Sequence, residues 1–420
     1  MLAEQALRLQ LARQIAHWRA AVVTIDDPSN FASAEAWAAV EGYLDLALRR
    51  RLQEAINRLR AESDGLAAQL QAARTAEQLV AVRARLIQFR QRYAQVETTL
   101  DFYGDAINTR TNPKLRAILR ALDLIAGRSM EALLRPLGRE APPALTYIDK
   151  GMGASILRAG VRLWDMGTVS PAAAIKITRH NLYRPTSLIH ETGHQVENIL
   201  GWAREFAELL RRELTPLAPS AVVDAWAETA TEVVADIFAF VHCGYAAVAA
   251  LHDVVAADEA TVLRYLPGDP HPLPYVRVLL NVEYCRRAFG SGPWDALAGA
   301  WIEMHPLTRA APGTREFLER STALLPKLAE LSLVRPMRAF GGRAIVQLLD
   351  PMRVHPTALL QWAKQLGPAL YTSPHWASTE PIRLLALSGY RMATEPERAQ
   401  EIANEYEAWT LRVGGLPRAA

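Results

Sequence analysis

The chain has almost no cysteine and no long uninterrupted apolar run. Cys243 and Cys285 are the only cysteines in 420 residues, which is too few for a disulfide framework or a cysteine-rich structural zinc module. The most apolar stretch, residues 237–251, contains His242 and is shorter than the ~20 residues that a membrane-spanning helix needs. We therefore expect reduced cysteines, a buried helix over 237–251 and no membrane span.

The chain also lacks a strong excess of charge of either sign. Its formal net charge is +3, and its 47 basic residues include only five lysines and form no dense run with aromatic residues between them. Nucleic-acid binding is therefore not predicted. The N-terminal stretch has no continuous apolar core and does not resemble a signal peptide, because it is interrupted by Glu4, Arg8, Arg13 and Arg19. A cytoplasmic protein is expected, although one exported by a dedicated machine would have the same features.

Half of the residues are hydrophobic, enough for a sizeable globular core, and residues 1–140 are predicted to be helical almost throughout. One helix should run from Ser33 to about Glu62 and end where Ser, Asp and Gly follow one another at 63–65. A second should begin at Thr75 with a capping-box pattern. Its apolar residues follow steps of four and three, at Val82, Leu86, Phe89, Tyr93, Val96, Leu100, Tyr103 and Ile107.

This apolar stripe predicts a helical hairpin or coiled coil that needs a partner surface. Packing against the helix at 33–62 of the same chain is the favoured interpretation. A homo-oligomer and a docking arm for another protein are the alternatives.

The rest of the chain predicts a mixed fold. Two shorter helices should end at Gly127 and Gly138, before a linker of Arg-Glu-Ala-Pro-Pro. Strands are predicted over 145–148, 155–164 and 173–178, and the strand nearest the histidine motif described next is the candidate for aligning a peptide backbone. We expect a predominantly helical α+β protein in three parts, namely an N-terminal region 1–140, a central domain 141–335 and a helical C-terminal region 336–420.

The chemistry of the chain centres on Leu-Ile-His-Glu-Thr-Gly-His-Gln at 188–195. His190 and His194 are four residues apart, so on a helix both imidazoles project from one face and can share a metal ion. In this H-E-x-x-H pattern the histidines bind zinc, and the glutamate, here Glu191, is the general base. A helix is predicted for the motif by a proline before it and a glycine after it, Pro185 and Gly201.

A catalytic zinc site has three protein ligands and an open position for water, so a third ligand is needed. A second long helix is predicted over 220–238, with acids in one stripe at Glu228, Glu232 and Asp236. Carboxylates in so apolar a helix need partners, and a metal with its histidines is such a partner. Glu232, Glu228 and, on the motif helix itself, Glu197 are the candidates.

Residues 232–236, Glu-Val-Val-Ala-Asp, resemble the E-x-x-A-D segment of gluzincin peptidases, the thermolysin-like zinc peptidases. The prenyl-protein endopeptidases and their bacterial heat-shock membrane relatives are the more similar group. The resemblance implies a zincin-like core with Glu232 as the third zinc ligand. It also implies that Asp236 is the carboxylate that orients a ligating histidine, His190.

A further stretch, His271-Pro272 followed by Arg277, resembles the His-Pro…Arg segment of the second of these groups, so that the resemblance covers residues 188–278. It implies that His271 stabilises the oxyanion of the tetrahedral intermediate. Three tyrosines are alternatives for this role, Tyr183, Tyr275 and Tyr284.

Together these features predict a zinc-dependent metallopeptidase that acts on a protein or peptide, with zinc on His190, His194 and Glu232 and with Glu191 as general base. Two other interpretations stay open. One is a non-catalytic zinc-binding scaffold that acts through its helical arms, and the other is a toxin or effector peptidase with one dedicated protein target. Glu191 favours catalysis, because a scaffold has no need of a base beside an open metal position.

Overall fold

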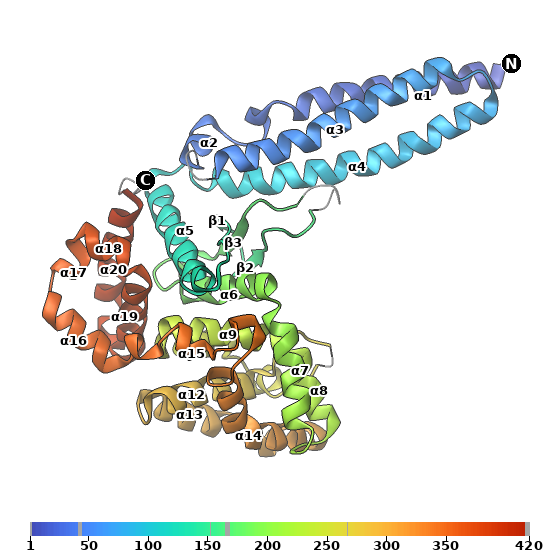
Figure 1. Cartoon of the computed structure of the whole chain (residues 1–420). Helices are drawn as coiled ribbons and strands as arrows, with labels where there is room; N and C mark the ends of the chain where they lie inside the picture. Colours follow the sequence, from blue (N-terminus) through green and yellow to red (C-terminus); the bar gives the residue numbers. More distant parts are fainter. Residues whose placement is uncertain (1, 41–43, 152, 164–168, 267, 416–420) are drawn as a thin grey trace. The chain divides into compact units, whose positions relative to one another are not determined.

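The computed structural model describes residues 2–40, 44–151, 153–163, 169–266 and 268–415. It is 76% helical with a small three-stranded sheet (Figure 1), which confirms a predominantly helical α+β fold. The zincin-like character of the core stays a proposal. The chain divides into two compact units, residues 1–116 with 157–174 and residues 117–156 with 175–420. The boundaries predicted at 140 and 335 stay predictions.

The first unit contains α1 Leu2–Ile25, α2 Ala34–Val40, α3 Asp45–Ala72 and α4 Ala76–Asn108, and α5 Pro113–Leu134 continues from it into the second. The strands are β1 Ala144–Ile148, β2 Ser155–Leu157 and β3 Ala173–Ile177. The other helices of the second unit are α6 Thr186–Leu200, α7 Trp202–Leu214, α8 Ser220–Glu228, α9 Ala230–Cys243, α10 Tyr245–Val255, α11 Glu259–Val262, α12 Pro274–Phe289, α13 Pro293–Met304, α14 Pro312–Leu333, α15 Ile345–Leu348, α16 Pro356–Leu366, α17 Ala369–Thr372, α18 Pro374–Thr379, α19 Pro381–Thr394 and α20 Ala399–Gly415.

Three long helices of the first unit, α1, α3 and α4, pack against one another (Figure 1). The apolar stripe predicted on α4 is buried at every position. Trp18 of α1 packs edge-on against Tyr93 in that stripe, with ring centroids 4.9 Å apart. The stripe is thus packed within the chain, against α1 as well as α3. The capping box of Thr75 and Gln78 is confirmed.

The helix predicted over 33–62 is represented by α2 and by α3, and residues 41–43 lie outside the described part of the chain. The break predicted at 63–65 is wrong, because α3 continues through it. Leu59 and Leu66, on either side of the break, are buried. Their packing outweighs the ~1 kcal/mol that glycine costs inside a helix.

One of the two helix ends predicted after Pro113 is wrong. Helix α5 continues through Gly127, where the neighbouring Ala126 and Met130 are fully buried. The chain turns at Gly138, as predicted, with a φ of 67° that glycine adopts without strain. Tertiary packing therefore overrides the tendency of glycine to end a helix at Gly127 but not at Gly138.

The three strands form one sheet in the order β1-β3-β2. They confirm the strands predicted over 145–148 and 173–178. Of the strand predicted over 155–164, only the start is found as β2, and Trp164 lies outside the described residues. Strand β3, which precedes the histidine motif, is the central strand and is paired on both sides, so it cannot align a peptide. The edges of this sheet are β1 and β2.

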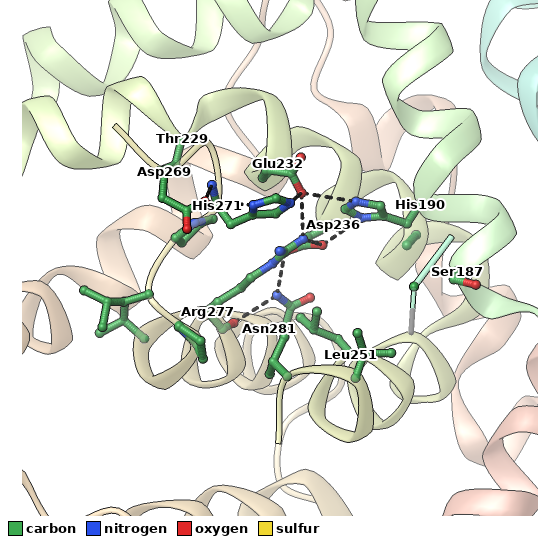
Figure 2. A pocket seen from close by; sticks show the side chains of 18 of the residues that line it. Ser187, His190, Thr229, Glu232, Asp236, Leu251, Asp269, His271, Arg277 and Asn281 are labelled. Atoms are coloured by element: carbon green, nitrogen blue, oxygen red, sulfur yellow. Dashed lines mark hydrogen bonds and ion pairs between the residues drawn. The ribbon is translucent and has the colours of Figure 1, made fainter. Parts of the chain in front are cut away.

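The second unit is built around α6 and α9, which pack along each other, and α10, α12 and α19 also contact α9. The apolar stretch 237–251 is buried over most of its length, but as the end of α9 and the start of α10, with Gly244 between them. No described helix combines the length and the apolar character needed to cross a bilayer. Residues of α6, α9, α10 and α12 line a cavity of about 450 Å³ (Figure 2).

Candidate metal centre

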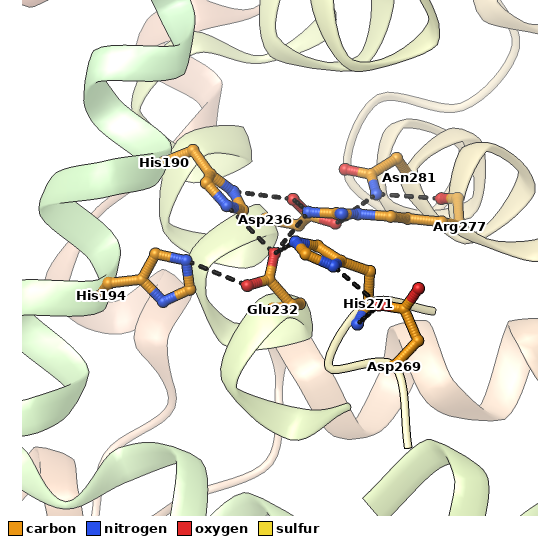
Figure 3. A network of polar contacts seen from close by, with 8 residues as sticks. All are labelled: His190, His194, Glu232, Asp236, Asp269, His271, Arg277 and Asn281. Carbon is orange, nitrogen blue, oxygen red and sulfur yellow. Dashed lines mark hydrogen bonds and ion pairs between the residues drawn. The ribbon is translucent and has the colours of Figure 1, made fainter. Parts of the chain in front are cut away.

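The H-E-x-x-H stretch lies on a helix, α6, as predicted. This helix follows Pro185 directly and ends at Gly201, whose φ of 66° is in the left-handed region. His190 and His194 project from α6 toward α9 (Figure 3), with ring centroids 4.9 Å apart. The four-residue spacing therefore places two imidazole groups side by side.

Glu232 approaches these rings from α9. The single long helix predicted over 220–238 is wrong, because the chain forms two helices there. Helix α8 ends at Glu228 and α9 begins at Ala230. Between them, the Thr229 hydroxyl donates to backbone carbonyl oxygens of α8. Glu232 consequently lies in the first turn of α9, where the helix dipole favours a carboxylate.

The ligand atoms of His190, His194 and Glu232 all lie within 4.8 Å of one another. The Nε2 atoms of His190 and His194 are each 3.3 Å from a different oxygen of Glu232. Nitrogen and oxygen atoms this close to one another can share one metal ion, whose bonds to them are about 2.0–2.2 Å long. The cluster could therefore hold a metal ion, and two imidazoles with one carboxylate are a donor set that zinc uses.

Neither rival for the third ligand belongs to a cluster of potential metal ligands in the described part of the chain. Glu228 is exposed at the end of α8. Glu197 is buried, but it lies on α6 beyond His194. The geometry therefore favours Glu232 over both.

Helices α6 and α9 approach closely at Gly193. A Cβ atom at this position would lie 2.9 Å from the Cα atom of Ala235 and 3.1 Å from the Cβ atom of Phe238, both on α9. Glycine thus permits the helix spacing at which the histidines of α6 meet Glu232 of α9.

We expect Gly193→Ala to destabilise the chain by about 1–3 kcal/mol, because the added methyl group overpacks the contact between α6 and α9. The affinity for added zinc should fall with it. Gly299→Ala on α13 is the matched control, since Gly299 is exposed and an added Cβ atom would have no neighbour within 4 Å. Urea unfolding and zinc titration measure both effects, and the prediction is wrong if the two variants behave alike.

Asp236, one turn beyond Glu232, is almost fully buried and orients His190. Its Oδ1 atom is 2.9 Å from Nδ1 of His190, which leaves Nε2 of the ring facing Glu232. It also accepts hydrogen bonds from Nε and Nη2 of Arg277 at 2.7 and 2.8 Å, and from Nδ2 of Asn281 at 3.3 Å (Figure 3). The orienting role of Asp236 stays a prediction, which this contact supports.

Arg277 and Asn281, for which no role was predicted, complete this network from α12. Arg277 is only 6% exposed, and its Nη2 atom also donates to Oε2 of Glu232 at 3.0 Å. One guanidinium group therefore bridges the candidate metal ligand and the carboxylate that orients His190. The sequence does contain a signal for this contact, because Arg277 is a lone arginine in an apolar helix segment. A charge buried in such a segment requires partners of opposite sign.

The titration of these groups reflects their mutual contacts. Burial alone would raise the pKa of Asp236, but Arg277 and His190 lower it to about 2. Burial would also raise the pKa of Glu232, which the two histidines and Arg277 lower instead. Conversely, burial would lower the pKa of His190, whereas hydrogen bonds to Asp236 and Glu232 raise it to about 10. A metal ion must displace a proton from His190, so binding should weaken as the pH falls.

Glu191 lies on α6 beside the cluster and lines the cavity. It is 8% exposed. Burial raises its pKa, and the nearby His190 and His194 offset part of this rise. A buried carboxylate with a raised pKa at the wall of a cavity is suited to accepting a proton.

His271 reaches the cluster from the loop before α12 (Figure 2). Its Nε2 atom is 3.6 Å from Oε2 of Glu232, and its Nδ1 atom is 2.9 Å from Oδ1 of Asp269. The same Asp269 oxygen accepts the backbone N–H of His271, so the ring is held toward the cluster although it is half exposed. Its role at the oxyanion stays a prediction. The three tyrosine alternatives are absent from the lining of the cavity, namely Tyr183, Tyr275 and Tyr284.

Comparison of the chain with known proteins finds no matching family model, curated protein or solved structure. The interpretation of the site therefore depends on the geometry and chemistry of its own residues. Membership of the gluzincin peptidases, which three short motifs suggest, stays a proposal.

Proposed function

We propose that the chain is a zinc-dependent peptidase of the gluzincin type, with zinc held by His190, His194 and Glu232. The observation that carries the proposal is the meeting of these three donors with the buried carboxylate of Glu191 at one cavity. Three protein ligands leave one position of a tetrahedral ion free, which is the pattern of catalytic rather than structural zinc sites.

Each residue around the cluster would have a defined task. Bound zinc would supply the positive charge that lowers the pKa of water toward about 7. The Glu191 carboxylate would accept the proton that water loses as it attacks the peptide carbonyl, and would pass that proton to the leaving amine. His271 would donate a hydrogen bond from Nε2 to the carbonyl oxygen as negative charge develops there, which requires both ring nitrogens to carry a proton because Nδ1 donates to Asp269. Asp236 would hold His190 with Nε2 toward the ion.

The cavity supports a peptide substrate. Its volume of about 450 Å³ lies within the ~300–1,000 Å³ typical of ligand sites. Glu191, His190 and Glu232 all line it, so a peptide bound there would lie beside both the metal ligands and the base. A scaffold protein would need neither the cavity nor the buried base.

Digestion of a mixed peptide library tests the proposal. The chain would be stripped of metal with a chelator, dialysed, and assayed before and after addition of one equivalent of zinc. We expect cleavage only in the zinc-loaded sample, with new N termini identified by mass spectrometry. A chain that holds one zinc ion yet cleaves neither the library nor proteins in a cell extract would contradict a peptidase of broad specificity and favour the other two interpretations, a peptidase with one dedicated target or a scaffold.

A further inference from the structure

The N-terminal end of α6 forms one corner of the cavity. In Figure 2 this corner, marked by Ser187, lies on the side of His190 that is away from His271. Thr186 and Ser187 open the helix, and Asn181 lies in the loop just before it. All three line the cavity together with His190. The corner therefore belongs to the same cavity as the candidate metal centre.

Three side chains in this corner hold polar atoms that lack a hydrogen-bond partner. These atoms are Nδ2 of Asn181, Oγ1 of Thr186 and Oγ of Ser187, and no partner is found for them within the described part of the chain. Asn181 and Thr186 are only 8% and 2% exposed, so bulk water does not replace the missing partner. Buried polar groups nearly always have a partner. Three without one in a single corner indicate that a ligand supplies the missing contacts.

The helix end in this corner also favours a negative group. The N-cap residue of α6 is Pro185, which offers no side-chain acceptor, and the first turn of the helix contains no acidic residue. The first N–H groups of a helix have no partner within the helix, and the helix dipole makes this end positive. An amide nitrogen, two hydroxyl groups and a positive helix end thus meet, which is the equipment of a site for an anion.

The position of the corner on α6 limits which anion of a peptide can reach it. Ser187 and His190 are three residues apart on the helix, which is a rise of about 4.5 Å. One residue of an extended peptide spans about 3.3–3.6 Å. A group bound in the corner is therefore one or two peptide residues away from a carbonyl beside His190. The negative group that every unmodified peptide carries is the carboxylate at its C terminus.

We propose that this corner binds the C-terminal carboxylate of a peptide, so that the chain removes the last one or two residues. The inference rests on the proposed zinc peptidase function and gives that function a substrate class, namely peptides with a free C terminus. In the cleaved bond, the carbonyl carbon gains the hydroxyl group of water and the released amine gains its proton. The inference is carried by three buried polar atoms without partners at one helix end in the metal-site cavity.

Three fluorescent peptides test the source of the carboxylate. They are dansyl-Ala-Phe-Ala with a free C terminus, its C-terminal amide, and dansyl-Ala-Phe-Glu amide, which carries a carboxylate on a side chain alone. Fluorescence titration of the metal-free full chain should show that the free acid binds about 10- to 100-fold more tightly than either amide, as expected for hydrogen bonds to a charged group. Equal binding of the free acid and its amide would overturn the assignment, and so would equal binding of the free acid and the glutamate amide.

Two variants locate the carboxylate in the corner. Thr186→Val keeps the shape of a buried side chain and removes one hydroxyl group, and Asn181→Asp places a negative charge beside the bound carboxylate. Each should reduce the preference for the free acid about tenfold or more and leave binding of its amide unchanged. Thr410→Val is the matched control, because Thr410 is a fully buried threonine of α20 that does not line the cavity. A preference that survives both variants would overturn the assignment.

Hydrolysis by the zinc-loaded chain separates this inference from the proposed function. Mass spectrometry should show loss of the last one or two residues from the free acid, at least about tenfold faster than from its amide. Equal cleavage of the free acid and its amide would overturn the carboxylate site while the peptidase function stands. A chain that prefers the free acid in binding but cleaves none of the peptides when loaded with zinc would support the carboxylate site and contradict the proposed function.

Discussion

Glu191→Gln should abolish peptide hydrolysis while zinc stays bound. The amide has nearly the shape of the carboxylate, so α6 and the metal cluster should keep their geometry, but it cannot accept a proton from water. A general base contributes about 10²–10⁴ in rate, and we expect kcat/KM to fall by at least that factor. The assay would use a peptide found by the library digestion, with zinc content measured by elemental analysis on the same sample.

The zinc content of Glu191→Gln decides whether Glu191 acts as a base or holds the ion. Loss of zinc from Glu191→Gln would mean that Glu191 holds the ion or the fold, which contradicts its assignment as a base. Glu228→Gln is the matched variant for the ligand set, because Glu228 lines the same cavity without joining the cluster. The Glu228→Gln variant should keep its zinc. Loss of zinc from this variant would mean that Glu228 is a zinc ligand.

The second large effect is expected at Arg277. Arg277→Leu leaves the carboxylates of Asp236 and Glu232 buried without the guanidinium group that bridges them. Removing one partner of a buried ion pair costs about 3–5 kcal/mol, so the free energy of unfolding from urea titration of the metal-free chain should fall by about that amount. Arg277→Lys keeps the charge but cannot make the forked contact. Its free energy of unfolding should therefore lie between those of the wild type and Arg277→Leu.

The pH dependence of this loss separates electrostatics from packing. The pKa of Asp236 is lowered from 3.8 to about 2, so its contribution to stability is present above about pH 4 and is lost as the pH falls through about 2. The difference between the wild type and Arg277→Leu should therefore stay constant from pH 7 to about pH 4 and shrink as the pH falls from about 4 to about 2. A difference that does not change with pH would mean that Arg277 acts through the packing of its alkyl chain.

The centre of the site could be predicted because its residues are close in sequence. The spacing of His190 and His194 fixes their common face on any helix, and Pro185 and Gly201 give that helix its limits. The same local rules predicted the capping box at Thr75. Such features depend on neighbours within a turn or two of helix, and the sequence displays them directly.

Other features of the structure depend on contacts that the sequence does not display. Arg277 meets Asp236 across 41 residues, and no local rule pairs those two side chains. The separation of α8 from α9 at Thr229 involves neither glycine nor proline, the usual punctuation of a helix. Conversely, α3 and α5 continue through Gly65 and Gly127 because buried neighbours supply more stability than glycine removes.

Metal content is the most direct test of the account. The wild type and His194→Ala would be purified after expression without added metal and analysed for zinc, with circular dichroism to compare their helix content. We predict about one zinc ion per wild-type chain and almost none in the variant at equal helix content, because two ligands cannot replace the three that meet in the cluster. Full zinc in the variant, or no zinc in the wild type, would contradict the assignment of His190, His194 and Glu232 as a metal site.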